Sequence, residues 1–282
     1  MQLKALQDFF QNGLLGYYPK EEITSFFNLL CEDRLNFKRI DISLKAETHM
    51  TPDTFEFFEA AMGRLLTYEP IQYVLGKTSF YGLDFSVNSK VLIPRPETEE
   101  LVAWILKDAN PNQPLKILDI GAGSGCIAIS LAKHLPQAAV YALDVSPEAL
   151  SIVQQNAKQH EVQITCIEAN VLEWTSADGS FDIIVSNPPY VREFEKKFMA
   201  PNVLEHEPHL ALFVENDVPL LFYNSIVELS KINLKKDGFL YFEINEYLGE
   251  ETKALFSSDL FEEVQLKTDI FTKPRLIRAK KR

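Results

Sequence analysis

The most chemically distinctive stretch of the sequence is an apolar run that ends in an asparagine, two prolines and a tyrosine. Residues 181–186 are almost uninterruptedly apolar, which is typical of a parallel-sheet strand covered on both faces. Pro188 and Pro189 lack a backbone N–H and disfavour helix, so the chain must leave the sheet as a stiff loop. The loop presents the Asn187 amide, backbone carbonyls and the Tyr190 ring at a strand end, where open α/β sheets bind ligands.

A planar group that carries an NH2 fits this set of residues. The side-chain oxygen of Asn187 and the carbonyl of Pro188 could accept its two hydrogens while Tyr190 stacks on its plane. The same residues could instead form only a proline-stiffened turn after a strand. The motif alone leaves both interpretations open.

A second candidate site is a glycine-rich turn followed by an acid one strand later. Gly121, Gly123 and Gly125 follow a predicted strand at the start of a helix, where a backbone without Cβ atoms lets a ligand approach closely. Their spacing differs from the dinucleotide fingerprint. Asp144 ends the next strand and can accept hydrogen bonds from ribose hydroxyls, which indicates a nucleoside-containing ligand. Asp119 can orient a cationic amine or a water, although either acid could instead cap a helix.

The order of the expected elements predicts an α/β domain preceded by a small helical one. Residues 1–72 predict a helical bundle, 73–95 a β-hairpin connector with its turn at 82–84, and 96–282 an alternation of strands and helices. The expected strands of the last segment are residues 115–119, 139–143, 163–167, 181–186, 239–244, 261–266 and 275–279. This alternation predicts a mostly parallel sheet with helices on both faces.

Composition and charge limit the possible functions. The 282 residues are 46% hydrophobic and 24% charged, as in soluble globular proteins, and no stretch approaches a membrane span. The N-terminus has no signal-peptide layout, so we expect a cytoplasmic protein that does not associate with membranes. The formal charge of −12 repels nucleic acid. The basic run at residues 273–282 is interpreted as a solvated tail, with a binding role as the alternative.

No metal site or disulfide framework is expected. The three cysteines are far apart and odd in number, which indicates core thiols. His206 and His209 could bind a metal, but Pro208 between them disrupts a helical ligand face. Arg95 and Glu97 belong to a proline-stiffened segment and could line a cleft or lie in a rigid linker.

Taken together, these motifs resemble those of S-adenosylmethionine-dependent methyltransferases, and more closely those of the HemK/PrmC family, which N5-methylates the glutamine of the Gly-Gly-Gln motif in peptide chain release factors. The resemblance covers nearly the whole chain, and its most specific part is Ile-Pro-Arg-Pro-Glu-Thr-Glu at residues 93–99. Related nucleic-acid methyltransferases share the Asn-Pro-Pro-Tyr ending but lack that segment. The resemblance implies a seven-stranded, mostly parallel, Rossmann-like sheet, a helical N-terminal domain that docks the substrate, and S-adenosylmethionine as cofactor.

The resemblance also implies roles for individual residues. The catalytic residues would be Asn187, Pro188 and Tyr190. The substrate would be held by Asn187, Pro188, Pro189, Tyr190, Arg95 and Glu97. The cofactor would be held by Gly121, Ala122, Gly123, Ser124, Gly125, Asp144, Trp174 and Asn187, with Trp174 near the adenine. Many relatives have an acid that contacts the adenine amine where this chain has Asn170, so the adenine contact is left open.

Four functions are considered on this basis. The leading one is methylation of the release-factor glutamine by a monomeric enzyme. The alternatives are methylation of an exocyclic amine on a nucleic-acid base, methylation of a ribosomal-protein glutamine, and a noncatalytic cofactor-binding module. The acidic charge argues against direct nucleic-acid binding.

Overall fold

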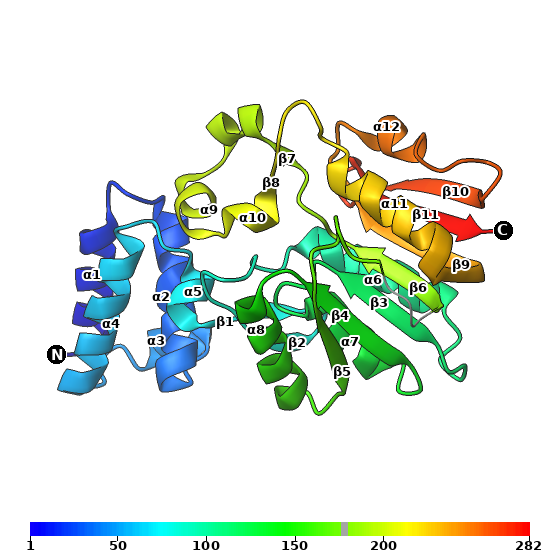
Figure 1. Ribbon diagram of the computed structural model, residues 1–282. Helices are drawn as coiled ribbons and strands as arrows, with labels where there is room; N and C mark the ends of the chain where they lie inside the picture. The colour runs from blue at the N-terminus through cyan, green and yellow to red at the C-terminus, as the bar shows by residue number, and fades with distance from the viewer. Residues whose placement is uncertain (176–179) are drawn as a thin grey trace. The chain divides into compact units, whose positions relative to one another are not determined.

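The computed structural model describes residues 1–175 and 180–282 (Figure 1). The chain divides into two compact units. One contains Met1–Gly76 and Ala200–His206, and the other contains Lys77–Met199 and Glu207–Arg282. The helical unit therefore extends beyond residue 72 and includes a later segment of the chain, while the hairpin belongs to the sheet unit.

The first unit is helical, and the helices of its N-terminal segment share one apolar core. Its helices are α1 (Leu3–Leu14), α2 (Lys20–Leu35), α3 (Arg39–Leu44), α4 (Pro52–Leu65), α5 (Ile71–Leu75) and α9 (Pro201–His206). The fully buried rings of Phe10, Phe27 and Phe58 pack against one another with centroids 5.2–6.1 Å apart. The aromatic residues of this segment thus supply its core.

The second unit contains a seven-stranded sheet in the order β10-β11-β9-β6-β3-β4-β5 (Figure 1). Its strands are β3 (Lys116–Ile120), β4 (Ala139–Asp144), β5 (Ile164–Glu168), β6 (Phe181–Ser186), β9 (Leu234–Glu243), β10 (Phe261–Thr268) and β11 (Pro274–Lys281). The first five pair in parallel, and β11 and β10 pair antiparallel at one edge. The predicted fold class is confirmed.

Helices cover both faces of this sheet. They are α6 (Pro96–Asp108), α7 (Cys126–His134), α8 (Pro147–Gln159), α11 (Leu221–Asn233) and α12 (Gly249–Lys253), with the shorter η1 (Glu193–Phe198) and α10 (His209–Leu212) in connections. Because successive strand residues point to opposite faces, Ile117 and Ile183 pack with side chains of α6, α7 and α8, whereas Leu118 and Ile184 pack with side chains of α11.

The strand order reverses between β3 and β6. From β3 the chain moves outward through β4 to β5, then returns to place β6 on the other side of β3. Ile120 and Ser186, the last residues of β3 and β6, are level with each other in the parallel register. The glycine turn and the Asn187 corner therefore leave the sheet side by side, at the switch point where such folds bind ligands.

The hairpin turn differs from the sequence prediction. β1 (Lys77–Phe80) and β2 (Leu83–Ser86) are joined by Tyr81 and Gly82, which have φ angles of 49° and 73°. Positive φ at both positions is the geometry of the tight turn that suits hairpin twist. The buried Asn156 of α8 then bonds both the N–H and the carbonyl of Ser86, at 2.8 and 3.1 Å, and so joins the hairpin to the sheet unit.

The basic C-terminal run forms a sheet strand, so its interpretation as a solvated tail is wrong. Arg278 lies within β11, is only 8% exposed and donates to Asp108 at 2.5 Å. Lys280 contacts Asp237 at 2.9 Å and Glu262 at 3.4 Å. The acidic partners needed to neutralise this run come from other elements. Separately, none of the helices in the described ranges has the length and apolarity needed to cross a membrane.

Candidate active site

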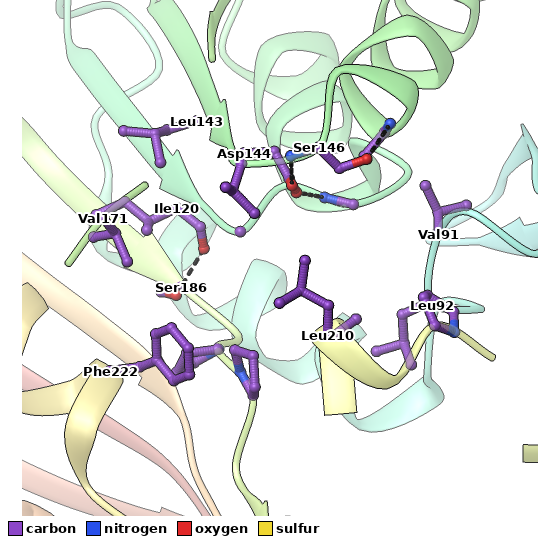
Figure 2. Close-up of a pocket in the computed structure, with 18 of the residues that line it drawn as sticks. Val91, Leu92, Ile120, Leu143, Asp144, Ser146, Val171, Ser186, Leu210 and Phe222 are labelled. Atoms are coloured by element: carbon purple, nitrogen blue, oxygen red, sulfur yellow. Dashed lines mark hydrogen bonds between the residues drawn. The ribbon is translucent and has the colours of Figure 1, made fainter. Parts of the chain in front are cut away.

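A cavity of about 500 Å³ lies at the carboxyl ends of β3, β4 and β6 (Figure 2). This volume is within the range of small-molecule sites. Of the predicted site residues, the cavity is lined by Gly121, Gly123, Asp144, Asn187, Pro188 and Pro189. The structure thus brings the two predicted motifs and the acid of β4 into one site.

The glycine turn is shaped by its backbone. The N–H groups of Gly121 and Ala122 both donate to the Leu143 carbonyl, at 2.8 and 3.1 Å, and Gly121 and Gly123 have φ angles of 74° and 55°. A Cβ at Gly123 would meet nothing within 4 Å, and one at Gly121 would lie 4.0 Å from the backbone oxygen of Asn187. These two glycines are therefore needed for their conformation and leave the backbone open to a ligand.

The remaining residues of the turn support it from behind. Ala122 and Ser124 are buried, and a Cβ at Gly125 would lie 3.0 Å from Ile129 Cδ1 and 3.1 Å from Val153 Cγ1. Neither these three residues nor Trp174 lines the cavity. We therefore expect Ala122, Ser124 and Gly125 to act by holding the turn, and their predicted contact with the cofactor stays a prediction.

Asp144 is fixed with its carboxylate at the cavity wall. Its Oδ2 accepts the N–H of Gly123 at 2.9 Å, and its Oδ1 accepts the N–H of Ser146 at 3.0 Å (Figure 2). Each carboxylate oxygen can accept more than one hydrogen bond. The arrangement therefore leaves acceptor capacity for two neighbouring hydroxyls, such as those of a ribose.

Asp119 is a buried acid behind the glycine turn, and its surroundings show whether a cationic ligand group would fit there. Its side chain is fully buried and accepts the N–H of Ala128 at 3.1 Å through Oδ2. Burial raises the pKa of this carboxyl from 3.8 to about 7; the Ala128 N–H opposes that rise and the Asp144 charge adds to it. Within the described residues, Asp119 Oδ1 and Ser124 Oγ have no hydrogen-bond partner. Buried polar atoms without partners are rare. Neither residue lines the cavity itself, so the unpartnered oxygen of Asp119 fits a cationic ligand group that reaches the underside of the turn.

The wall beside β4 and β6 is largely apolar. Figure 2 shows Leu143, Ile120, Val171 and Phe222 along this side, and Leu210 extending from α10 across the opening. Such a surface suits a flat heteroaromatic ring. These apolar side chains could not be identified from the sequence, because their types are also those of ordinary core residues.

The predicted adenine contacts are only partly found at this wall. Asn170 lines the cavity, and its Oδ1 already accepts the N–H of Leu172 at 3.1 Å. Trp174 instead packs against the apolar core on the α11 side of the sheet and does not line the cavity. The backbone around Asn170 is therefore closer to the site than the tryptophan that was expected beside the adenine.

The Asn187 corner is held from behind by α6 and β9. Asn187 Nδ2 lies 3.4 Å from the hydroxyl oxygen of Thr98, which donates to Glu243 at 2.6 Å. The Tyr190 hydroxyl also donates to Glu243, at 3.0 Å. Burial raises the pKa of Glu243, although its hydrogen bonds from Thr98 and Tyr190 oppose the rise. Burial likewise raises the pKa of Tyr190, and the Glu243 charge raises it further, so Tyr190 stays a hydrogen-bond donor.

Tyr190 does not line the cavity. Its ring packs against the core on the α11 side and borders a separate hollow with Arg192 and Tyr247. Val191–Arg192 (β7) then pairs with Phe213–Val214 (β8). The predicted stacking of Tyr190 on a substrate therefore stays untested, whereas its hydroxyl clearly anchors the end of the corner.

Arg95 and Glu97 also lie outside the cavity lining. Arg95 Nη2 lies 2.7 Å from Oε1 of the buried Glu207, whose Oε2 accepts the N–H of Ile93 at 3.2 Å. This ion pair joins two segments whose neighbours, Leu92 and Pro208, line the cavity. Glu97 is half-buried in the first turn of α6. In the described ranges no group of three or more histidines, cysteines or acids could hold a metal ion.

The sheet order and a switch-point cavity with these side chains define the S-adenosylmethionine-dependent methyltransferase class, and S-adenosylmethionine is the cofactor. Residues 99–211 match the family model for the methyltransferase small domain, and residues 19–76 match that for the PrmC N-terminal domain. The chain belongs to the release factor glutamine methyltransferase family.

Two relatives carry this assignment. The release factor glutamine methyltransferase of Flavobacterium psychrophilum is 49% identical over 282 residues, with 99% of both chains covered. That of Bacteroides thetaiotaomicron is 43% identical over 281 residues, covering 98% of this chain and 99% of its own. The resemblance predicted from the sequence is confirmed.

Solved structures support the fold alone. A methyltransferase from Pyrococcus furiosus superposes with a TM-score of 0.52 at 17% identity, covering 79% of this chain and 98% of its own. The 16S rRNA N2 G1207 methyltransferase of Thermus thermophilus gives a TM-score of 0.51 at 17% identity, covering 73% and 50%.

Proposed function

We propose that this chain transfers the methyl group of S-adenosylmethionine to the side-chain amide nitrogen (N5) of the glutamine in the Gly-Gly-Gln motif of peptide chain release factors. The observation that carries the proposal is the 49% identity, over 99% of both chains, to a protein named for that activity. The Asn187 corner at the cavity supplies side chains suited to a carboxamide.

Some residues of the cavity would hold the methyl donor, S-adenosylmethionine, and others the glutamine that accepts the methyl group. Asp144 would accept the ribose hydroxyls, the backbone of Gly121 and Gly123 would lie against the donor, and Asp119 would complement its ammonium group. The wall around Val171 would hold the adenine. When bound, the cofactor supplies an electrophilic methyl group on a sulfonium.

The target nitrogen is a poor nucleophile because its lone pair is delocalised into the carbonyl. Asn187 Oδ1 and the Pro188 carbonyl would each accept one N–H of the glutamine amide, which leaves the lone pair free to face the methyl group. Holding two reactants in line can contribute up to ~7–11 kcal/mol. No general base is required before attack, since the methylated, protonated amide loses its proton readily. Pro189 and Tyr190 would hold this corner rigid.

We further propose that the helical unit and the hairpin dock the release factor, with Arg95 and Glu97 near the bound substrate. The helical unit has its own core and its own match to the PrmC N-terminal domain, which supports a role separate from catalysis. The enzyme would act as a monomer in the cytoplasm.

The nearest rival is methylation of an exocyclic amine on a nucleic-acid base, because the same corner also fits that planar NH2. The net charge of −12 weighs against it. The basic run of β11 is engaged with acids of the chain, so it offers little free charge for phosphates. A ribosomal-protein glutamine is a third candidate with the same chemistry.

The test is incubation of the purified enzyme with labelled S-adenosylmethionine and one of four acceptors: a release factor, the same factor with its Gly-Gly-Gln glutamine replaced, ribosomal protein, or nucleic acid. We expect label on the intact factor only. Label that persists on the replaced factor, or that appears only on another acceptor, would refute the proposed target.

A further inference from the structure

Glu243 is a buried acid at the end of β9 that the proposed reaction does not use directly. It is 1% exposed, and its two carboxylate oxygens bond different hydroxyls: Oε2 accepts from Thr98 at 2.6 Å and Oε1 accepts from Tyr190 at 3.0 Å. Both hydroxyls are the donors in these bonds. They stabilise the ionised form of Glu243 against the rise in pKa that burial causes, and an ionised carboxylate can only accept hydrogen bonds. The hydroxyl hydrogens of Thr98 and Tyr190 are therefore both directed at Glu243.

This arrangement determines how Thr98 can interact with Asn187. A threonine hydroxyl has one hydrogen and two lone pairs. The hydroxyl hydrogen of Thr98 is already donated to Glu243 in a hydrogen bond. Thr98 Oγ1 can therefore only accept a hydrogen bond from the Asn187 side chain, whose Nδ2 lies 3.4 Å away. The opposite orientation of the Asn187 amide would place its oxygen against a hydroxyl oxygen that has no hydrogen to give.

The orientation of the Asn187 amide decides what the cavity can bind. With Nδ2 turned toward Thr98, Oδ1 is the atom left to accept a hydrogen bond from an NH2 in the cavity. With the amide reversed, the NH2 of Asn187 would face the NH2 of the substrate, donor against donor. A freely rotating asparagine would sample both orientations.

We propose that Glu243 and Thr98 are positioning residues that fix the Asn187 amide with its oxygen toward the substrate nitrogen. This inference rests on the proposed function, because it concerns the same acceptor. Glu243 acts on both ends of the Asn187–Tyr190 corner, since its second oxygen holds Tyr190. Asn245, two residues further along, adds a bond from Nδ2 to the Tyr190 carbonyl at 3.0 Å.

Thr98→Val is the direct test, because valine keeps the shape of threonine and removes the hydroxyl. We expect kcat for methyl transfer to fall roughly ten- to a hundredfold, which corresponds to one hydrogen bond in the reacting state. The affinity for S-adenosylmethionine, measured by calorimetry, should stay within about twofold, since Thr98 does not line the cavity. Thr98→Ser, which keeps the hydroxyl, should retain most of the wild-type kcat. Glu243→Gln should lower kcat and leave the affinity for S-adenosylmethionine unchanged.

A matched control is Thr252→Val. Thr252 is also fully buried, and its hydroxyl donates to the Leu248 carbonyl at 2.7 Å in a helix outside the cavity lining. This variant should keep the wild-type kcat. If Thr98→Val is insoluble, Thr98→Ala takes its place, with donor affinity as the check that the site is folded.

A double-mutant cycle separates positioning from general support. If Thr98 acts through Asn187, then Thr98→Val should lower the residual kcat of Asn187→Ala by less than about twofold. Fully additive losses, or wild-type kcat in both Thr98→Val and Glu243→Gln, would overturn the inference while leaving the proposed function intact. Absence of methyl transfer by the wild-type enzyme to every acceptor would instead contradict the proposed function itself.

Discussion

Replacing Asp144 by asparagine tests the S-adenosylmethionine site with little change in side-chain shape. In the structure, the two carboxylate oxygens each accept a backbone N–H, from Gly123 at 2.9 Å and Ser146 at 3.0 Å. An amide in the same place turns an NH2 toward one of these donors and keeps a single oxygen for the cavity. One ribose hydroxyl then loses its acceptor, and the other bonds a neutral oxygen instead of a charged one.

The size of the effect follows from these two changes. A hydrogen bond to a charged group contributes about 1.5–3 kcal/mol, and exchanging a charged acceptor for a neutral one loses about 1 kcal/mol more. At 1.4 kcal/mol for each factor of ten, Asp144→Asn should weaken S-adenosylmethionine binding about 60- to 700-fold. Titration calorimetry on the wild-type protein and the variant measures this ratio directly.

The matched control is Asp182→Asn at the opposite end of the same sheet. Asp182 also accepts a backbone N–H, from Lys116 at 2.7 Å, and contacts Lys235 at 2.8 Å, but it lies at the start of β6. Its substitution should leave donor affinity within about twofold. A loss below threefold for Asp144→Asn, or an equal loss for Asp182→Asn, would refute the assignment of Asp144 to the ribose.

Three further predictions concern the turn and the corner. Asn187→Ala should lower kcat far more than donor affinity, because its oxygen serves the substrate; equal losses in single-turnover and calorimetric measurements would contradict that role. Gly125→Ala should lower the free energy of unfolding in urea by roughly 2–5 kcal/mol, since φ is 79° and the new Cβ would crowd Ile129 at 3.0 Å; a change below 1 kcal/mol would contradict it. Burial raises the pKa of Asp119 from 3.8 to about 7, so the native state favours the protonated carboxyl. The free energy of unfolding of the wild type should therefore fall from pH 4 to pH 7, and that of Asp119→Asn should lack this decrease. Binding of the cationic donor should tighten over pH 6–8 in the wild type and stay flat in that variant, and a flat wild-type profile would count against contact with its ammonium group.

The parts of the site that could be predicted from the sequence are those encoded by local pattern. The apolar run before Asn187, the prolines after it and the glycine spacing at 121–125 each dictate their own backbone. Parallel strands place their carboxyl ends at one edge of a sheet, which explains why these turns and Asp144 meet; that they form one site was implied by the family resemblance.

The supporting residues could not be predicted because their partners are distant in sequence. Thr98 and Glu243 are 145 residues apart and meet only because α6 packs beside β9, next to β6. Tyr190 was expected at the site for its flat ring and Trp174 from the family resemblance, yet the structure packs both rings against the core on the α11 side. An aromatic side chain next to a motif can serve the core as readily as a ligand, and only the tertiary packing decides which.

The prediction of a solvated tail at the basic C-terminal run was wrong for a similar reason. Charge density alone favoured a solvated tail, but Arg278 is neutralised by Asp108 at the end of α6, and its neighbours Leu276 and Ile277 are buried in the sheet. The strand pattern of 275–279 was the better guide than the charge, because burying Leu276 and Ile277 outweighs the cost of burying an arginine that is paired with an acid.

The central claim is that the corner at Asn187 holds a glutamine carboxamide by both of its hydrogens, beside the donor. A crystal structure with S-adenosylhomocysteine and a peptide containing Gly-Gly-Gln tests this most directly. The account predicts that the glutamine amide nitrogen lies about 3 Å from both Asn187 Oδ1 and the Pro188 carbonyl oxygen. A glutamine bound elsewhere, or an Asn187 side chain directed away from it, would contradict the account.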